Sequence, residues 1–259
     1  DADRLKENSD LKVISFEHTS HNWLMLNNEK PGLDNQNVRH AINSAIDKES
    51  VVTVAYNGMA TPAVSQMPMN FEGATEENAD TYDVEKAKQL LKEAGYEDGF
   101  SMTITVPSNY TPHMNVAEVL VEQLAQVGIT ATINPVEWET WLSETYMGRD
   151  FESTVVGFDA ATLSAGALLN RWMSDNENNM INYDNPEYDA IMEKANTTTD
   201  DAEQTELYKQ AAKLLTETAA NVYIQDLADF VLIKSDLDGY QFYPLYVMDL
   251  STVHYVQSV

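Results

Sequence analysis

The spacing of apolar residues changes along the chain, and each change predicts a different kind of element. Between residues 37 and 46, apolar side chains recur at helical spacing, which is typical of a helix with one buried face. Between residues 100 and 106 the period falls to two, as in a strand. Asp47, Asp83 and Asn185 are of the residue types that cap helix starts. The predicted helices are 37–46, a short helix after Asp47 that ends at Gly58, 84–94, about 113–127, 138–145, one that begins at Pro186, and about 201–218.

Three predicted strands alternate with these helices in the middle of the chain, at 100–106, 129–134 and 154–158. Strand, helix and strand in units of about 30 residues are typical of βαβ crossovers. The sequence therefore predicts an α/β fold, with these strands in a mixed sheet covered by the intervening helices. A late strand is expected around Val222 and Ile224, whereas the C-terminal residues are rich in aromatic side chains but weakly patterned.

Composition and charge restrict the kinds of partner. With 259 residues, of which 43% are hydrophobic, the chain can bury one sizeable core or two modest ones. Its 42 acidic and 15 basic side chains give a formal net charge of −27, which repels phosphate backbones and anionic lipid headgroups. We therefore expect no nucleic acid partner. No apolar run reaches the roughly 18 residues that a membrane-spanning helix needs.

Recognisable catalytic and metal-binding motifs are missing from the sequence. The chain has no cysteine and contains no nucleophile elbow, phosphate loop or zincin motif. His18 and His21 lack a nearby third metal ligand. Residues 175–179 begin like a calcium loop, but Met180 and Pro186 stand where its glycine and its bidentate glutamate belong. We therefore expect no metal and no cofactor.

Aromatic and amide side chains gather instead where predicted strands end or helices begin. Asn109 and Tyr110 follow one strand, Trp138 opens a helix, and Phe158 ends another strand. Open α/β sheets bind ligands at the carboxyl ends of their strands, and such side chains offer flat apolar area and adaptable hydrogen bonds. Core packing is the commoner role of a tryptophan such as Trp138 or Trp141. Without catalytic motifs, the pattern favours a ligand-binding protein over an enzyme.

Four ordered segments resemble the family-5 solute-binding proteins of bacterial ABC importers. They are residues 37–50 (NVRHAINSAIDKES), 56–63 (YNGMATPA), 82–96 (YDVEKAKQLLKEAGY), and 123–133 (QLAQVGITATI) with the following VEW. These match a helix pair, a turn, a helix, and a helix with its next strand, in the order of that family. The resemblance implies a receptor that closes two lobes around its ligand without covalent chemistry.

The resemblance also implies a division of the chain. Residues 22–226 are expected to form a C-terminal α/β ligand-binding lobe, with the periplasmic binding protein-like type II fold. Residues 1–21 would cross from an N-terminal lobe that this sequence lacks, and residues 227–259 would pack on that lobe. The implied partners are a small-molecule or peptide ligand, ABC permease subunits and the N-terminal lobe. The implied location is extracytoplasmic, in the periplasm or on the cell surface as a lipid-anchored protein.

The sequence departs from the peptide-binding members at the residues that hold the two ends of a peptide. In those members an aspartate after the strand equivalent to 155–158 receives the amino terminus, and here Ala161 occupies its place. Asp159 lies two residues earlier, which in an extended segment keeps the same face about 6–7 Å away. Dipeptide-binding members also carry basic residues before the long helix, where this chain has residues 111–115 (TPHMN). A peptide remains the leading ligand class, ahead of a glycan-like or other polar solute.

We expect the ligand contacts to come from loops and helix starts at the carboxyl ends of the strands. The candidate residues are Asn109, Tyr110, Trp138, Phe158, Asp159 and Thr162. Asp159 has an alternative role as the cap of the following helix. Two other functions stay open: a hydrolase that uses carboxylates such as Asp159 and Glu137, about 5–10 Å apart in a closed cleft, and a non-catalytic interaction module with a flat surface.

Overall fold

The computed structural model describes residues 5, 7–69, 71–159, 164–241 and 248–256, with the backbone alone described at 15–21, 158–159 and 227–230. A six-stranded mixed sheet with the strand order β2-β6-β1-β5-β3-β4 forms its centre. The strands are β1 (Leu11–Leu26), β2 (Ala60–Pro62), β3 (Phe100–Pro107), β4 (Ile129–Val136), β5 (Ser153–Asp159) and β6 (Asn221–Lys234). β3 runs parallel to β4 and β5, whereas β1 runs antiparallel to β5 and β6. The predicted mixed sheet with strands 100–106, 129–134 and 154–158 is confirmed.

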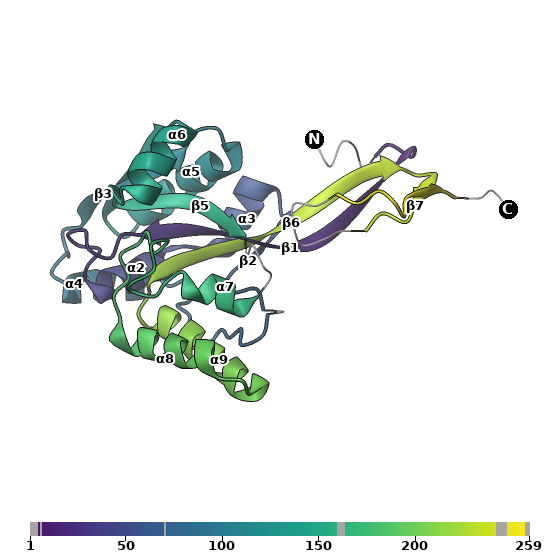
Figure 1. Cartoon of the computed structure of the whole chain (residues 1–259). Helices are drawn as coiled ribbons and strands as arrows, with labels where there is room; N and C mark the ends of the chain where they lie inside the picture. The colour runs from purple at the N-terminus through teal and green to yellow at the C-terminus, as the bar shows by residue number, and fades with distance from the viewer. Residues whose placement is uncertain (1–4, 6, 70, 160–163, 242–247, 257–259) are drawn as a thin grey trace.

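Helices cover both faces of this sheet (Figure 1). They are α2 (Gln36–Ala45), α3 (Lys48–Tyr56), α4 (Val84–Glu93), α5 (Thr111–Ala125), α6 (Trp138–Thr140), the π-helix η1 (Trp141–Met147), α7 (Ala165–Asn170), α8 (Pro186–Thr197) and α9 (Asp201–Glu217). The predicted caps are confirmed, because the side chains of Asp47, Asp83 and Asn185 accept hydrogen bonds from the first turns of α3, α4 and α8.

Each face of the sheet carries its own hydrophobic core. One core joins α2, α3, α4 and α5 to sheet residues such as Leu24 and Ile104. The other joins η1, α7, α8 and α9 to Trp23, Val156 and Tyr223. The central strand β1 therefore sends alternate side chains into two cores, and Trp23 to Leu26 are all fully buried.

The central strand β1 was not predicted from the sequence. The strand is buried on both faces at residues 23–26, so its apolar and polar residues do not alternate. The late strand expected at Val222 and Ile224 is the 14-residue β6, and the short β2 and α7 were also missed. β2 has three residues and α7 has six, which is too short for a hydrophobic period to be recognised.

β1 and β6 continue beyond the sheet as a two-stranded ribbon. β5 pairs with β1 as far as Ser20, and β2 pairs with β6 as far as Leu227. Farther out, residues 11–17 of β1 pair only with residues 228–234 of β6 within the described chain. Figure 1 shows the ribbon projecting from the lobe, with β7 (Leu237–Asp238) beside it. β7 pairs with β8 (His254–Tyr255).

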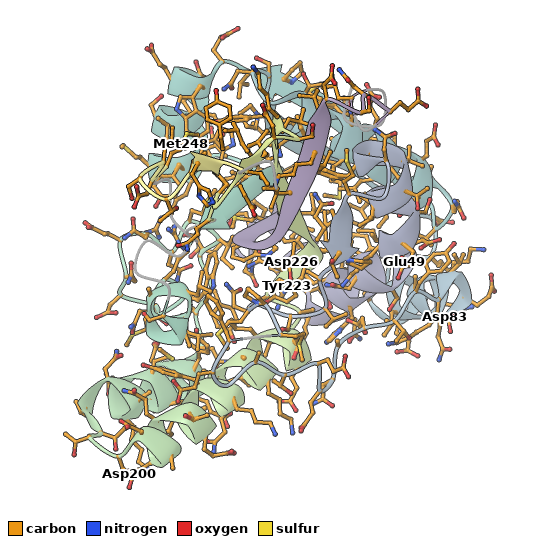
Figure 2. All side chains as sticks on the ribbon, turned by 90° about the vertical axis from the view of Figure 1, so that its right-hand side faces the viewer. Glu49, Asp83, Asp200, Tyr223, Asp226 and Met248 are labelled. Carbon is orange, nitrogen blue, oxygen red and sulfur yellow. The ribbon has the colours of Figure 1, made fainter. Side chains whose placement is uncertain are left out.

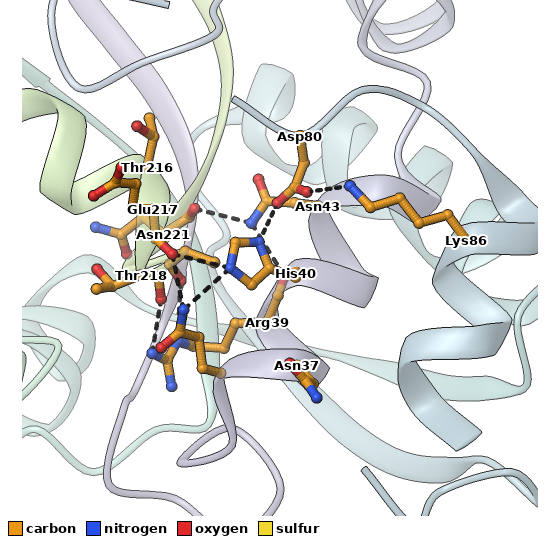
Figure 3. A network of polar contacts seen from close by, with 12 residues as sticks. Asn37, Arg39, His40, Asn43, Asp80, Lys86, Thr216, Glu217, Thr218 and Asn221 are labelled. Atoms are coloured by element: carbon orange, nitrogen blue, oxygen red, sulfur yellow. Dashed lines mark hydrogen bonds and ion pairs between the residues drawn. The ribbon is translucent and has the colours of Figure 1, made fainter. Parts of the chain in front are cut away.

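A polar network joins α2 to the carboxyl end of α9 (Figure 3). The guanidinium of Arg39 is buried and donates to the backbone oxygens of Thr218 and Ala219, 2.8 and 3.0 Å away. His40 Nε2 lies 3.1 Å from the carbonyl oxygen of Glu217. Burial lowers the pKa of Arg39 to about 10, so the group stays charged at neutral pH. These donors satisfy carbonyl groups that the end of a helix leaves without a partner, and they hold the two helical layers together around the edge of the sheet.

Candidate ligand-binding site

The strands β3, β4 and β5 end at one edge of the sheet. Because β3 and β4 are parallel and pair to their ends, with Pro107 opposite Val136, the residues that follow them lie side by side. Tyr110 and Trp138 follow these two strands, and their ring centroids are 5.5 Å apart with planes at 75°. The structure thus brings together two predicted site residues that are 28 positions apart in the sequence.

The same edge adjoins the ribbon. Asp159, the last residue of β5, pairs with Ser20 of β1, close to the point at which β1 leaves the sheet. Asn109 is exposed, and Tyr110 keeps 41% of its surface exposed. Trp138 is half-buried, since its indole packs on the second core. The exposed parts of Asn109, Tyr110 and Trp138 therefore lie where an open α/β sheet offers a ligand site.

Tyr110 and Trp138 form the outer end of a longer run of rings, here called the aromatic row, which consists of Tyr110, Trp138, Trp141 and Tyr146. Trp138 and Trp141 stack with centroids 5.1 Å apart and planes at 6°. Trp141 and Tyr146 stack at 5.9 Å and 26°. Trp141 is only 2% exposed, whereas Trp138 and Tyr146 on either side of it are half-buried. The row therefore runs from the exposed Tyr110 through the core at Trp141 to Tyr146, which is here called its inner end. The core role that is commoner for tryptophans applies to Trp141, whereas Trp138 is shared between core and surface.

A π-helical turn produces this alignment. The sequence analysis predicts one regular helix over 138–145, but only Trp138–Thr140 are α-helical and Trp141–Met147 form a π-helix. In an α-helix, residues five apart point about 140° away from each other, because each residue turns the chain by about 100°. The wider π turn, with Gly148 N bonded to Ser143 O at 2.9 Å, lets Trp141 and Tyr146 share a face. Such turns occur frequently at functional sites.

Hydrogen bonds hold the inner end of the row. The indole Nε1 of Trp141 donates to Thr154 Oγ1 of β5 at 2.9 Å. The Tyr146 hydroxyl donates to Asn178 Oδ1 at 2.8 Å and accepts from Arg171 Nη1 at 3.0 Å. The Arg171 guanidinium also lies 5.9 Å from the centroid of the Tyr146 ring. These hydrogen bonds hold the rings of Trp141 and Tyr146 in place.

His113 extends the row on the surface side. Its imidazole lies 5.1 Å from the Tyr110 ring at 36°, and its Nδ1 is buried without a hydrogen-bond partner among the described residues. Burial lowers the pKa of His113 to about 4 because the charged imidazole is poorly solvated there. The ring is neutral at physiological pH and adds apolar surface, not charge.

The remaining predicted contacts are only partly described. The backbone of Phe158 and Asp159 ends β5, and Phe158 pairs with His21 of β1. Thr162 and Ala161 lie outside the described residues. The helix that follows, α7, is capped by Ser164, whose hydroxyl accepts from Ala167 N at 3.2 Å. The cap position that was the alternative role of Asp159 is therefore filled by another residue.

Neither a metal site nor a membrane-spanning helix is found in the described part of the chain. No three His, Asp or Glu side chains come together there in a way that could hold a metal ion. No helix there is long and apolar enough to cross a bilayer. Glu137, the other carboxylate of the hydrolase alternative, is exposed at the start of α6 and its side chain makes no capping hydrogen bond.

Sequence reasoning missed Tyr146, His113, Thr154 and Arg171 as parts of this site. The signal for Tyr146 was the spacing of the aromatic residues. Trp141 comes three positions after Trp138, and Tyr146 comes five positions after Trp141, a step that does not keep two rings on one face of a regular α-helix. Residues 111–115, which include His113, drew attention only because they contain no lysine or arginine. The position of His113 beside Tyr110 could not be predicted from this. Thr154 and Arg171 carry no local signal, because their roles depend on partners from other elements.

Comparison with solved structures defines the class of fold. The chain superposes with a TM-score of 0.91 on CtaP, an ABC transporter substrate-binding protein from Listeria monocytogenes, at 24% identity, covering 99% of this chain and 54% of that one. The fold is that of a type II periplasmic binding protein lobe. DppA, a periplasmic binding protein from Helicobacter pylori solved with the peptide STSA, gives a TM-score of 0.87 at 27% identity, over 98% of this chain and 50% of that one.

Comparison of sequences identifies the family. Residues 1–180 match the bacterial extracellular solute-binding proteins, family 5, and the chain belongs to this family. The glutathione-binding protein GsiB of Salmonella choleraesuis is 33% identical over 220 residues, covering 82% of this chain and 43% of that protein. The chain thus spans less than half the length of this curated relative. The family resemblance and the fold class expected from the sequence are both confirmed.

Proposed function

We propose that this chain is the ligand-binding lobe of an extracytoplasmic receptor that captures a peptide or another polar solute and delivers it to an ABC permease. The observation that carries the proposal is the exposed end of the aromatic row at the carboxyl ends of β3 and β4, in a chain of the solute-binding family. Relatives support peptides as the leading class, since GsiB binds glutathione and DppA was solved with a peptide.

The ribbon supports a second lobe in the complete protein. Residues 1–21 and 227–259 would cross to that lobe and pack on it, with the paired β1 and β6 as the connection. Large apolar side chains on the C-terminal segment are exposed to solvent, among them Met248 at 70% and Tyr255 at 66%. Met248 is labelled in Figure 2. Surfaces of this kind mark interfaces in soluble proteins. The extra length of GsiB and of DppA is enough to supply a lobe of similar size.

The proposed ligand contacts combine flat apolar area with polar groups. Tyr110 and Trp138 cover an apolar face of the solute, and Asn109 offers an adaptable amide beside them. Phe158, Asp159 and Thr162 contact it from the end of β5 and the residues that follow it. Asp159 supplies a carboxylate to a polar group of the solute, and Ser164 as the α7 cap leaves it available for this role.

Closure of the two lobes, with no covalent step, is the proposed mechanism. The partners are the solute, the permease subunits and the second lobe, and no nucleic acid is involved. The site of action is the periplasm, or the cell surface with a lipid anchor. Membership of a solute-binding family supports a receptor over the carboxylate-dependent hydrolase and over a flat interaction module.

Native mass spectrometry of the complete protein, purified under mild conditions, tests the proposal. We expect a co-purifying peptide or polar solute that is released intact on denaturation. Recovery of a cleaved product, with hydrolytic activity that follows the protein through purification and disappears in Asp159→Asn, contradicts the proposal in favour of the hydrolase. A complete protein that neither retains nor rebinds any peptide or polar solute contradicts it in favour of the interaction module.

Calorimetry with the solute found in this way tests the contact made by Asp159. We expect Asp159→Asn to weaken binding by one to two decades, since a hydrogen bond to a charged group contributes about 1.5–3 kcal/mol. The thermal stability of the variant should match that of the wild type. Unchanged affinity with lowered stability would show a structural role for Asp159 instead.

A further inference from the structure

The surface around the exposed end of the aromatic row has an unusual charge. From Glu93 to Gly148 the chain contains no lysine and no arginine, and this segment holds β3, α5, β4, α6 and η1. Three exposed glutamates, Glu137, Glu139 and Glu144, lie on the same short helical segment as the other three rings of the row. This part of the lobe is therefore an aromatic surface in a negative field.

The nearest arginines after this segment in the sequence are committed elsewhere. Arg149 donates to Asn182 Oδ1 at 2.9 Å and to the carbonyl oxygen of Glu177. Arg171 donates to Tyr146 at the inner end of the row. His113, which lies against Tyr110, is held neutral at physiological pH by burial, which lowers its pKa to about 4. No cationic side chain of the segment is thus available to balance a ligand carboxylate.

Helix starts are the other possible source of positive potential, and here they offer little. A helix N-terminus carries at most about half a positive charge, spread over its free N–H groups. At the start of α5, Pro112 has no N–H, and the N–H groups of His113 and Met114 already donate to the carbonyl oxygen of Tyr110. At the start of α6 the N-cap residue is itself a glutamate, Glu137. The field of the acidic side chains therefore prevails over that of the helix ends.

The ring geometry suits a positive group. Aromatic faces attract cations through their quadrupoles, and tryptophan does so most strongly. Tyr110 and Trp138 meet edge to face, at 75° with centroids 5.5 Å apart, and the angle between their solvent-exposed parts is here called the corner. Trp141 and His113 back these rings at about the same separation, 5.1 Å each. Aromatic corners of this kind hold alkylated ammonium groups in other proteins.

We infer that the corner between Tyr110 and Trp138 binds a cationic, alkyl-bearing nitrogen group of the solute, an ammonium or a guanidinium, and disfavours a carboxylate. The inference rests on the proposed function, and it specifies which part of the solute this lobe contacts. A peptide fits this inference, since it presents such groups on its basic side chains or its amino terminus.

Choline and its uncharged analogue 3,3-dimethylbutan-1-ol are suitable probes, because they have the same shape and differ in the charge on the central atom. Titration into the ¹⁵N-labelled 259-residue chain can be followed at the indole N–H signals of its four tryptophans. We expect choline to shift the Trp138 signal saturably and to bind about 3- to 30-fold more tightly than the alcohol, the range of exposed to partly buried cation–π contacts. Acetate should leave the signal unchanged.

Variants locate the effect. Trp138→Leu and Tyr110→Leu should each weaken choline binding, read for the first variant at the Trp141 signal. Tyr82→Leu is the matched control, since Tyr82 is also an exposed tyrosine, at 49%, but lies before α4. The indole signals of the buried Trp23 and Trp172 report whether each variant is folded. If Tyr110→Leu does not fold, the inference is still tested by the Trp138→Leu variant and by the ratio of the wild-type affinities for choline and for the alcohol.

Equal binding of choline and the alcohol, or preferred binding of acetate, overturns the inference. So does choline binding that Trp138→Leu leaves unchanged. The proposed function fails separately, when the complete protein captures no solute. A complete protein that retains a neutral or anionic solute while its lobe shows no choline preference leaves the receptor function standing and removes only the inferred cation site.

Discussion

The rings of Trp141 and Tyr146 stack with centroids 5.9 Å apart although five residues separate them in the chain. Only the π-helical turn of η1 brings positions at this spacing onto one face. The stack continues outward through Trp138 to Tyr110 and inward to Arg171. A local irregularity of one helix thus connects the core to the candidate ligand surface.

The hydrogen bond between Trp141 and Thr154 should hold this arrangement together. Thr154→Val keeps the shape of the side chain but leaves the buried indole N–H of Trp141 without its acceptor. We expect the free energy of unfolding in urea to fall by about 1–3 kcal/mol. Thr132→Val makes the same change at an exposed position of β4 and should cost far less. Equal losses in the two variants would contradict the assigned role of the bond.

Gly99 should tolerate no side chain at its point of contact with Gly128. A Cβ atom at Gly99, where φ is +77°, would lie 1.9 Å from the carbonyl oxygen of Gly128. At Gly58 φ is similar, +72°, but the space is open. We expect Gly58→Ala to cost about 1–2 kcal/mol from backbone strain, and Gly99→Ala a further ~1–3 kcal/mol from the clash. Urea unfolding measures the loss of stability in both variants. Similar losses in Gly58→Ala and Gly99→Ala would mean that the starts of β3 and β4 can move apart to make room for the methyl group.

The carboxylate of Asp80 should stabilise the fold at pH values above the ordinary pKa of an aspartate, and this stabilisation should be lost in acid. Burial raises the pKa of Asp80, but hydrogen bonds from His40 and Lys86 outweigh burial and hold it below the ordinary value of 3.8 (Figure 3). The unfolded chain therefore takes up the proton first as pH falls. Asp80→Asn should cost about 1–2 kcal/mol at pH 7, and the difference should shrink below pH 3.8.

Urea unfolding at several pH values measures this difference between the wild type and Asp80→Asn. The same substitution at Asp175, an exposed loop residue, is the control and should change little at any pH. A gap between Asp80→Asn and the wild type that stays constant down to pH 3 would show that the carboxylate charge does not carry the stabilisation.

His113 should make the stability of the fold depend on pH in a higher pH range than Asp80 does. Its folded pKa of about 4 lies below the ordinary value of 6.5, so between these values the unfolded chain binds more protons and stability declines as pH falls. His113→Phe keeps a ring against Tyr110 and removes the titrating group. We compare the free energy of unfolding of the variant with that of the wild type. Between pH 7 and pH 5 this difference should shift by about 1–2 kcal/mol in favour of the variant. His254→Phe, at an exposed position, should show no such gain.

Much of the fold followed from local patterns. The caps Asp47, Asp83 and Asn185 were visible because a cap acts on backbone groups two or three residues away. The strands β3, β4 and β5 were visible from their short apolar runs and the helices between them. Tyr110 and Trp138 could be predicted as site residues because the carboxyl ends of parallel strands meet at one edge.

The tertiary structure alone decided the rest. The position of β1 at the centre of the sheet depends on contacts with β5 and β6, which are more than a hundred residues away in the chain. Burial on both faces removes the alternation that identifies a strand in sequence. Trp141 at the start of η1 packs in the second core and bonds to Thr154, and both contacts are with residues from other elements.

The sequence by itself determined which segments become helices or strands wherever a period of two or 3.6 survives, because these periods record a single buried face. It also determined the family and the absence of positive charge from residue 93 to residue 148. Only the tertiary structure decided that this segment places four of its aromatic rings in one row, since stacking depends on how distant elements pack. Short-range rules describe neighbours along the chain, whereas a binding surface is made of neighbours in space.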